Sequence, residues 1–349
     1  MKLGQQIEAG WLSAFNRVVI KDGTRFDLPE EYQEQLAGAG GSGSKAAACL
    51  QFEYDLKGGS ILDLTLTSAN RPDATDAKEV LDTITKNDLV LRDLGYYVFS
   101  AFDNIIKKGA YFISRLGFTT IVYELIQGEL QRLDFKALYT YMKQRQLVSL
   151  QKQVWIGAKE MIPVRLVIEL LPEAIYEQRM RKVKDKHRRK KNKTSSEYKE
   201  KARFNLFITN VSEETLPAEI VSQLYRIRWQ VELVFKIWKS NMGIHNSRRM
   251  KYIRWLCLLR FKLLLMIINW NIIMVQRNDV YRKGQLLSLD KCFKTLFDNT
   301  DRLRAAIRQG IKGITEFLHW IGKILTKNHW LERKNKSRGL EEIIYLLYC

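Results

Sequence analysis

Residues that could do chemistry are concentrated in Leu224–Lys239, a stretch with the sequence LYRIRWQVELVFKIWK. Drawn as a helix at about 100° per residue, it places an acid, two cations and a phenol within an arc of roughly 60°, beside an apolar arc that can face a core. The four polar residues are Tyr225, Arg228, Glu232 and Lys239. Taken alone, such a group is ordinarily a solvated helix face with an i,i+4 ion pair between Arg228 and Glu232. A chemical role requires further carboxylates elsewhere in the chain.

Two aspartates stand upstream, each at the end of a predicted strand. Asp22 follows the apolar run Val18–Ile20, which is typical of a central strand. Asp93 ends the short apolar segment Asp88–Asp93. An Asp-Gly pair such as the one at Asp22 is commonly only a turn, but this one comes at the end of a buried strand, where a sheet presents functional side chains.

The spacing Tyr-x2-Arg-x3-Glu-x6-Lys, with the motifs Asp-Gly-Thr and Asp-Leu-Gly-Tyr at the two aspartates, resembles the DDE transposases of the insertion-sequence type-4 (IS-4-like) family. The resemblance implies that Asp22, Asp93 and Glu232 are the three catalytic carboxylates. It also implies that the remaining residues of the helical motif contact DNA near the cleaved end; these are Tyr225, Arg228 and Lys239.

The elements that must position these residues alternate between strands and helices. After the strand that leads to Asp22, a hairpin is predicted, because two alternating segments flank a glycine-rich turn; the segments are Leu50–Leu56 and Ile61–Thr67. A helix, a strand, a helix and a strand then follow at Asp73–Thr85, Asp88–Asp93, Tyr97–Lys108 and Ala110–Leu116. This order predicts an α/β fold of the ribonuclease H-like type, a mixed sheet flanked by helices.

A long segment separates the last of these strands from the helix that carries Glu232, which indicates an insertion. We predict that 1–116 forms the first part of the catalytic core, 117–203 a mostly β insertion, 204–286 the rest of the core and 287–349 a C-terminal helical region. Within the insertion, strands are predicted at Ile121–Ile126, Leu147–Gly157 and Met161–Leu171, with a helix around Phe135–Arg145. The resemblance implies that this insertion touches the transposon end.

A basic arm at 172–203 departs from this β character, and its run Arg179–Lys193 is the densest charge run in the chain. Such a run can be a solvated or disordered arm. It can also follow DNA phosphates, since clustered cations release counterions on binding, and order can arrive with the DNA. The residues selected for DNA contact are Arg188, Arg189, Lys190 and Lys191.

Two features depart from the family pattern. Some relatives carry a tryptophan, just before the strand that leads to the signature helix, which stacks on a flipped base; this chain has Phe204 there, and its ring could stack. Relatives also carry a long N-terminal DNA-binding region, whereas 21 residues precede Asp22 here. The expectation is therefore an N-terminally truncated chain that could be inactive.

Composition favours a nucleic-acid partner. The 349 residues carry a formal net charge of +20, from 58 Lys+Arg against 38 Asp+Glu, which suggests a polyanion, with nucleic acid ahead of an anionic membrane. The four cysteines form no CxxC pair and are interpreted as buried or free thiols in a reducing compartment. Charged and amide residues interrupt the apolar segment Trp255–Val275, which favours a buried helix over a membrane span.

Together these observations predict the catalytic part of a cut-and-paste DNA transposase. It would use two Mg²⁺ ions, for which Mn²⁺ could substitute, held by the three carboxylates. Its partners would be transposon-end DNA and target DNA, with a homodimer in the DNA complex, no membrane, and a place in the bacterial cytoplasm at the nucleoid. Two alternatives stay open: a catalytically inactive DNA-binding transposase remnant, and a ribonuclease H-fold nuclease that only hydrolyses.

Overall fold

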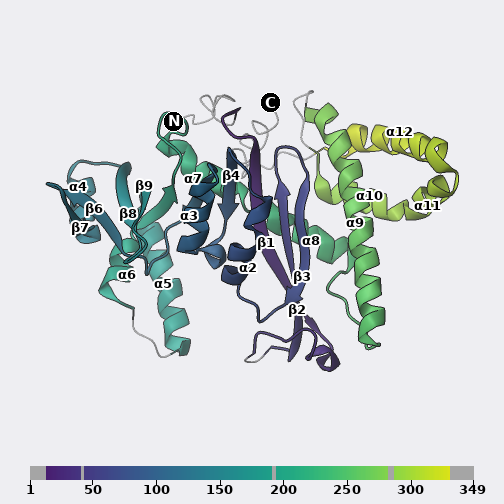
Figure 1. Cartoon of the computed structure of the whole chain (residues 1–349), viewed down its shortest axis with the longest axis horizontal. Coiled ribbons are helices and arrows are strands. Elements are labelled where there is room, and N and C mark those ends of the chain that lie inside the picture. The colour runs from purple at the N-terminus through teal and green to yellow at the C-terminus, as the bar shows by residue number, and fades with distance from the viewer. Residues whose placement is uncertain (1–12, 41–42, 191–193, 282–286, 331–349) are drawn as a thin grey trace. The chain divides into compact units, whose positions relative to one another are not determined.

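The structure is a computed structural model and describes residues 13–40, 43–190, 194–281 and 287–330. The chain divides into two units. Figure 1 labels their helices and strands. Unit 1 comprises Met1–Ser13, Val19–Pro72 and Ile227–Cys349, and unit 2 comprises Ala14–Val18 and Asp73–Arg226. The chain therefore passes from unit 2 to unit 1 within its first strand and again just before Arg228.

Unit 1 contains an antiparallel meander of three strands, β1 (Arg17–Leu28), β2 (Ala46–Asp55) and β3 (Ile61–Ser68). Every residue of β2 is buried, as expected of a strand covered on both faces. The β2–β3 connection contains Gly59 at φ +78°, where a Cβ would also lie 2.7 Å from the Met274 sulfur, so both conformation and space require glycine. The predicted hairpin is confirmed.

The core of unit 1 forms where aromatic side chains from two helices meet β2. The helices are α8 (Gln230–Met242) and α9 (Tyr252–Tyr281). The ring of Phe52 on β2 lies 4.6 Å from that of Trp238 and 5.7 Å from that of Trp270, both edge-on. Such pairs contribute about 0.5–1.5 kcal/mol each beyond their buried area. This packing fixes α8 against the strand that neighbours β1.

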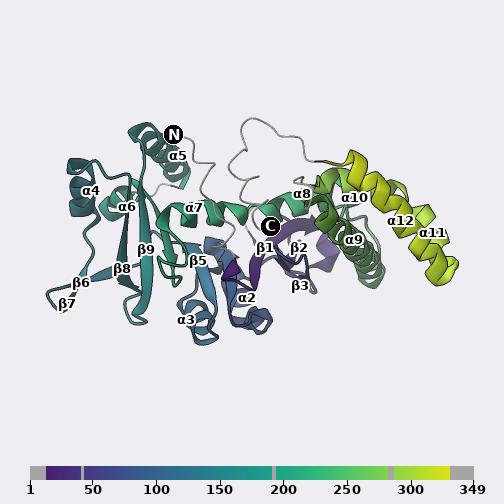
Figure 2. The same ribbon diagram turned by 90° about the horizontal axis from the view of Figure 1, so that it is seen from above.

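The helix α9 is buried along one face only. Trp255, Met266 and Trp270 are buried, which confirms the predicted core role for that face, whereas Phe261 and Val275 are 68% and 67% exposed. Within the described residues, α9 is the one helix long and apolar enough to cross a membrane by length and composition, and 33% of that apolar window is buried. Among its described residues, unit 1 has three further α-helices, namely α10 (Leu289–Asp298), α11 (Thr300–Arg308) and α12 (Gly310–Asn328). Both α10 and α12 pack on α9 (Figure 2).

Unit 2 contains a mixed sheet. Its strand order is β4 (Asp88–Arg92), β5 (Tyr111–Arg115), β10 (Phe204–Thr209), β9 (Ile162–Leu170), β8 (Ser149–Ile156), β6 (Val122–Ile126) and β7 (Glu129–Arg132). The pair β4–β5 is parallel, and the helix α3 (Phe99–Lys107) supplies the crossover that a parallel pair needs. The other neighbours pair antiparallel. The predicted alternation of strands and helices is confirmed.

Unit 2 has five further α-helices among its described residues, and two of them begin at the residue where a helix was predicted, Asp73 and Phe135. The five are α2 (Asp73–Glu79), α4 (Phe135–Gln144), α5 (Glu173–Lys190), α6 (Ser196–Lys201) and α7 (Ala218–Ile227). Asp134 caps α4 by accepting backbone N–H bonds from Lys136 and Ala137, which explains where that helix begins. The strands and the helix predicted between 117 and 171 are all present, whereas the boundaries of the insertion as a domain stay a prediction.

The basic run is helical up to Lys190 and is anchored at its start. Arg179 donates to the carbonyl oxygens of Ala202 and Phe204 and to the side-chain oxygen of Asn205, at 2.8–2.9 Å. Its guanidinium therefore links α5 to the start of β10. The segment Glu173–Lys190 is thus a helix in this structure, whereas the contact of its basic run with DNA stays a prediction.

One helix prediction needs correction. The stretch predicted as a single helix, Leu224–Lys239, is divided between α7 and α8, with a turn at Arg228 and Trp229. There the amides of Val231 and Glu232 donate to carbonyl oxygens three residues back, at 3.3 and 3.2 Å, so the backbone tightens. The break places Glu232 in the first turn of α8.

Candidate active site

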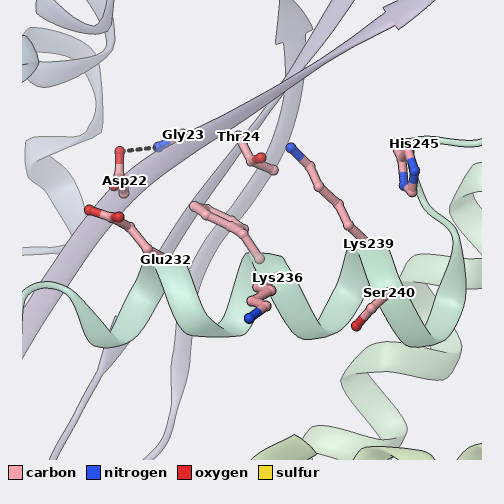
Figure 3. A pocket seen from close by; sticks show the side chains of 9 residues that line it. Asp22, Gly23, Thr24, Glu232, Lys236, Lys239, Ser240 and His245 are labelled. Carbon is pink, nitrogen blue, oxygen red and sulfur yellow. Dashed lines mark hydrogen bonds between the residues drawn. The ribbon is translucent and has the colours of Figure 1, made fainter.

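Asp22 and Glu232, both in unit 1, face one pocket of about 610 Å³ (Figure 3). Asp22 projects from β1 and Glu232 from α8, so the pocket lies along the line where this strand and this helix pass each other. Its lining comprises Asp22, Gly23, Thr24, Glu232, Phe235, Lys236, Lys239, Ser240 and His245. Two of the three predicted catalytic carboxylates therefore come together in one unit.

Arg228 links these two carboxylates. One terminal nitrogen of its guanidinium lies 3.1 Å from an Asp22 oxygen, and the other lies 2.9 Å from a Glu232 oxygen. The Arg228 side chain is 12% exposed, so both ion pairs are partly shielded from water. The predicted i,i+4 pair between Arg228 and Glu232 is present, but it is half of a bridge that also reaches β1.

Backbone features hold the two acids in place. The other oxygen of Asp22 accepts the Gly23 N–H at 2.8 Å, drawn as a dashed line in Figure 3. A Cβ on Gly23 would lie 3.0 Å from the Cys49 sulfur and from the Gln51 amide nitrogen, so the close approach of β1 to β2 favours glycine after the aspartate. Glu232 lies in the first turn of α8, where the helix dipole stabilises an ionised carboxylate.

The opposite end of the pocket is cationic. Lys239 lies in the last turn of α8, and its ammonium donates to the Arg25 carbonyl oxygen at 3.1 Å. Burial lowers the pKa of Lys239 from the ordinary value of 10.5. In Figure 3, Lys239 points to the same side of α8 as Glu232, and His245 stands beyond it. The pocket therefore runs from an acidic end to a basic end along one helix.

Asp93 and Tyr225 meet in unit 2. Asp93 directly follows β4 and precedes the 3-10 turn η4 (Leu94–Tyr96). The Tyr225 hydroxyl lies 3.4 Å from an Asp93 oxygen and 3.4 Å from the Arg92 carbonyl oxygen. Tyr225 is 7% exposed, and its ring packs on Phe207. Its hydroxyl is thus directed at the second aspartate, and its contact with DNA stays a prediction.

The remaining predicted DNA contacts have different surroundings. Phe204 is 1% exposed and packs near Phe135 and Tyr139, so its ring faces are closed to a base in this structure. Arg188, Arg189 and Lys190 form the end of α5, and Lys191 lies outside the described residues. The sequence alone could not distinguish a core residue from a base-stacking one, because an aromatic ring at the start of a strand suits both roles. The burial of Phe204 shows that it is a core residue in this structure.

Sequence reasoning missed three polar residues of the pocket, Lys236, Ser240 and His245. Ser240 follows Lys239 on α8, and His245 follows the helix end at Gly243, which adopts the left-handed conformation at φ +55°. The signal available in the sequence was the spacing of Lys236 and Ser240 from Glu232, four and eight residues, which places all three along one helical strip. His245 has no such signal, because a turn brings it to the pocket.

Paired carboxylates beside cations suited to phosphate, on an α/β fold, are typical of enzymes that transfer phosphoryl groups of nucleic acids. The family model described as "Transposase DDE domain" matches residues 13–270. The chain therefore belongs to the DDE transposase family and is a DNA transposase of the IS-4-like type. The predicted ribonuclease H-like α/β class is confirmed with it.

Similar proteins carry the same designation. The chain is 30% identical, over 97% of its length, to the transposase for insertion sequence element IS231F of Bacillus thuringiensis subsp. israelensis, of which it covers 73%. It is 28% identical, over 97%, to the transposase for IS231B of Bacillus thuringiensis subsp. berliner, again covering 73%. It is 26% identical, over 95%, to the transposase for IS1151 of Clostridium perfringens, covering 73%.

Members of this family generally use divalent metal ions. Carboxylate oxygens are the ligands that hard cations such as Mg²⁺ prefer, and Asp22 and Glu232 present theirs to one pocket. Across the ranges that the structure describes, no three His, Cys, Asp or Glu side chains are gathered as a ready set of metal ligands. Asp22 and Glu232 nevertheless fit a cation, because their two carboxylates already lie close enough to share one positive group, the Arg228 guanidinium.

Proposed function

We propose that this chain cuts the inverted-repeat ends of its insertion element and joins the freed 3′-hydroxyl groups to target DNA. The observation that supports this most directly is the pocket between β1 and α8, in which Asp22 and Glu232 share one guanidinium and Lys239 lies farther along the same helix. An acidic end suits metal-dependent phosphoryl transfer, and a basic end suits the phosphates that flank the reacting bond.

Asp22, Asp93 and Glu232 are the proposed catalytic carboxylates and the ligands of two Mg²⁺ ions, with Mn²⁺ as a substitute. When bound, such ions activate the attacking water or 3′-hydroxyl and stabilise the leaving oxygen. The support for Asp93 comes from its motif and from its position directly after a buried strand. The support for Asp22 and Glu232 comes in addition from their common pocket.

The DNA contacts of this proposal use cations of different geometry. Arg228 presents a planar fork that suits two phosphate oxygens, and Lys239 presents a compact charge. Lys239 already donates to a carbonyl oxygen, which holds its side chain extended along the pocket. The cations Arg188, Arg189, Lys190 and Lys191 would contact phosphates farther from the cleaved bond. The protein would act as a homodimer on its DNA, in the bacterial cytoplasm at the nucleoid.

The decisive experiment is strand cleavage and joining with the element's own end DNA and Mg²⁺. The expected result is a nick at the element's boundary, followed by covalent joining of the 3′ end to a second duplex. Cleavage without joining would instead make the protein a hydrolytic nuclease. Binding of the ends without cleavage, in Mg²⁺ and in Mn²⁺, would leave a DNA-binding remnant and overturn the proposal.

A further inference from the structure

Two kinds of anion, a DNA phosphate and a pair of carboxylates, could bind the Arg228 guanidinium. The family motif implies that it holds a DNA phosphate, whereas in this structure it bridges Asp22 and Glu232 at 3.1 and 2.9 Å. A guanidinium carries five N–H donors in a fixed plane, and the donors now directed at the two carboxylates cannot turn to a phosphate without leaving them. A phosphate held through these same donors therefore competes with the bridge.

The same argument applies to the cation. A divalent ion held by Asp22 and Glu232 would draw on the same two negative charges that now face the Arg228 guanidinium. Its two positive charges would also stand close to the guanidinium, and the low exposure of Arg228, 12%, reduces the screening of that repulsion by water. Metal binding and the Arg228 bridge consequently compete for one pair of acids.

We infer that Arg228 is a positioning residue that couples metal binding to DNA binding, by releasing Asp22 and Glu232 to the metal when a DNA phosphate takes its guanidinium. Before DNA binds, the bridge keeps the two acids paired and balances half of their charge, and it weakens their affinity for a divalent cation. When a phosphate offers an alternative anion, the guanidinium leaves the acids, and their freed charge attracts the cation. This inference rests on the proposed function, because it assumes that these two acids hold the metal.

Coupling of this kind is reciprocal. If DNA tightens metal binding by a given factor, metal must tighten DNA binding by the same factor, and such factors are typically about 5- to 150-fold. The consequence for the protein is that the metal site becomes competent only when DNA is present. Free protein would then bind divalent ions weakly at the concentrations at which the DNA complex is loaded.

The test measures Mn²⁺ affinity of the full chain by electron paramagnetic resonance, with and without a short blunt-ended DNA duplex. For the wild type we expect weak Mn²⁺ binding alone and binding tightened by roughly tenfold with the duplex. Arg228→Gln should bind Mn²⁺ more tightly than the wild type without DNA, and the duplex should add little. Arg228→Lys keeps the charge but replaces the planar fork by a compact ammonium that spans two separate carboxylates less well, so its affinity without DNA should fall between the two.

Control variants distinguish the coupling role of Arg228 from a merely structural one. They also distinguish a failure of this inference from a failure of the proposed function. Arg226→Gln removes a neighbouring exposed arginine and should leave Mn²⁺ affinity unchanged, and thermal unfolding of every variant checks its fold. If Arg228→Gln binds Mn²⁺ as weakly as the wild type, or more weakly, Arg228 only orders the acids and the inference is wrong. If the wild type binds no Mn²⁺ even with DNA, or if Glu232→Gln leaves binding intact, the metal site of the proposed function fails as well.

Discussion

The surroundings of the carboxylates differ between the two units. In unit 1, Asp22 and Glu232 share a charged guanidinium through ion pairs of 3.1 and 2.9 Å. In unit 2, Asp93 accepts from a neutral phenol, that of Tyr225, at 3.4 Å. An ion pair adds the attraction of opposite charges to the hydrogen bond, whereas a 3.4 Å contact is longer than the usual length, about 2.5–3.0 Å, of an O–H···O bond. The acids of unit 1 are thus strongly held by a cation, whereas Asp93 is only lightly restrained.

The largest effect is expected when an acid loses its charge. Glu232→Gln keeps size and hydrogen bonding but removes the charge that would hold a cation, so nicking in Mg²⁺ should fall by orders of magnitude while end-DNA binding persists. The measurement is single-turnover nicking beside a gel-shift titration. Glu316→Gln, an exposed acid on α12, is the matched control and should cleave normally. Normal cleavage by Glu232→Gln would remove it from the site.

Substitutions of Asp93 and of Tyr225 should reduce nicking to different extents. Asp93→Asn should abolish nicking nearly as completely as Glu232→Gln, because the proposal makes it a metal ligand. Tyr225→Phe removes one long hydrogen bond, and a bond of this kind contributes about 0.5–1.5 kcal/mol, so nicking should fall by roughly tenfold or less. Equal losses in both variants would show that the phenol, through DNA or through Asp93, matters far more than its 3.4 Å contact indicates.

Substitution of Lys239 should have a smaller effect, on DNA affinity, and this effect should depend on pH. Lys239→Ala should weaken end-DNA binding by roughly tenfold, or about 1.4 kcal/mol. The pKa of Lys239 is lowered by burial, so its charge is fully present below that pKa and is lost as the pH rises through it, earlier than for an exposed lysine. The affinity of the wild type should therefore decline in alkaline solution before that of Lys239→Arg, whose charge persists. Parallel pH profiles for the two proteins would contradict this assignment.

The basic run that begins in α5 should make DNA binding more sensitive to salt. Neutralising Arg188, Arg189, Lys190 and Lys191 together should reduce the slope of log affinity against log salt by roughly 0.9 for each DNA phosphate that these cations neutralise in the wild type. Fluorescence anisotropy over a salt series measures the slope. Lys312→Gln with Lys323→Gln, two exposed lysines of α12, provides a comparison. An unchanged slope in the quadruple variant would make the run only a solvated arm.

The smallest effect on DNA is expected at Phe204. Because its ring is 1% exposed and packs near Phe135 and Tyr139, Phe204→Leu should lower the thermal stability and leave end-DNA affinity unchanged. Thermal unfolding and anisotropy on the same preparation distinguish the two properties. A loss of DNA affinity without a loss of stability would restore the base-stacking role inferred from the resemblance.

The amino-acid sequence by itself predicts the family and the positions of most strands and helices. The motifs around Asp22, Asp93 and Glu232 indicated the family, because phosphoryl transfer needs acids and cations at particular spacings. The periodicity of apolar residues located most strands and helices, since side chains alternate along a strand and repeat about every 3.6 residues along a helix. These are properties of the local chain, and they do not depend on what the chain packs against.

Tertiary structure decided the rest. The helix predicted through Arg228 is broken there, and the same residue reaches β1 to bridge Asp22 and Glu232, a contact between residues far apart in sequence. Phe204 is a core residue because strands and helices close over it, and α9 keeps an exposed apolar face because only one of its faces is packed. Local patterns state what each residue is able to do, whereas the partner that it meets depends on how distant segments pack.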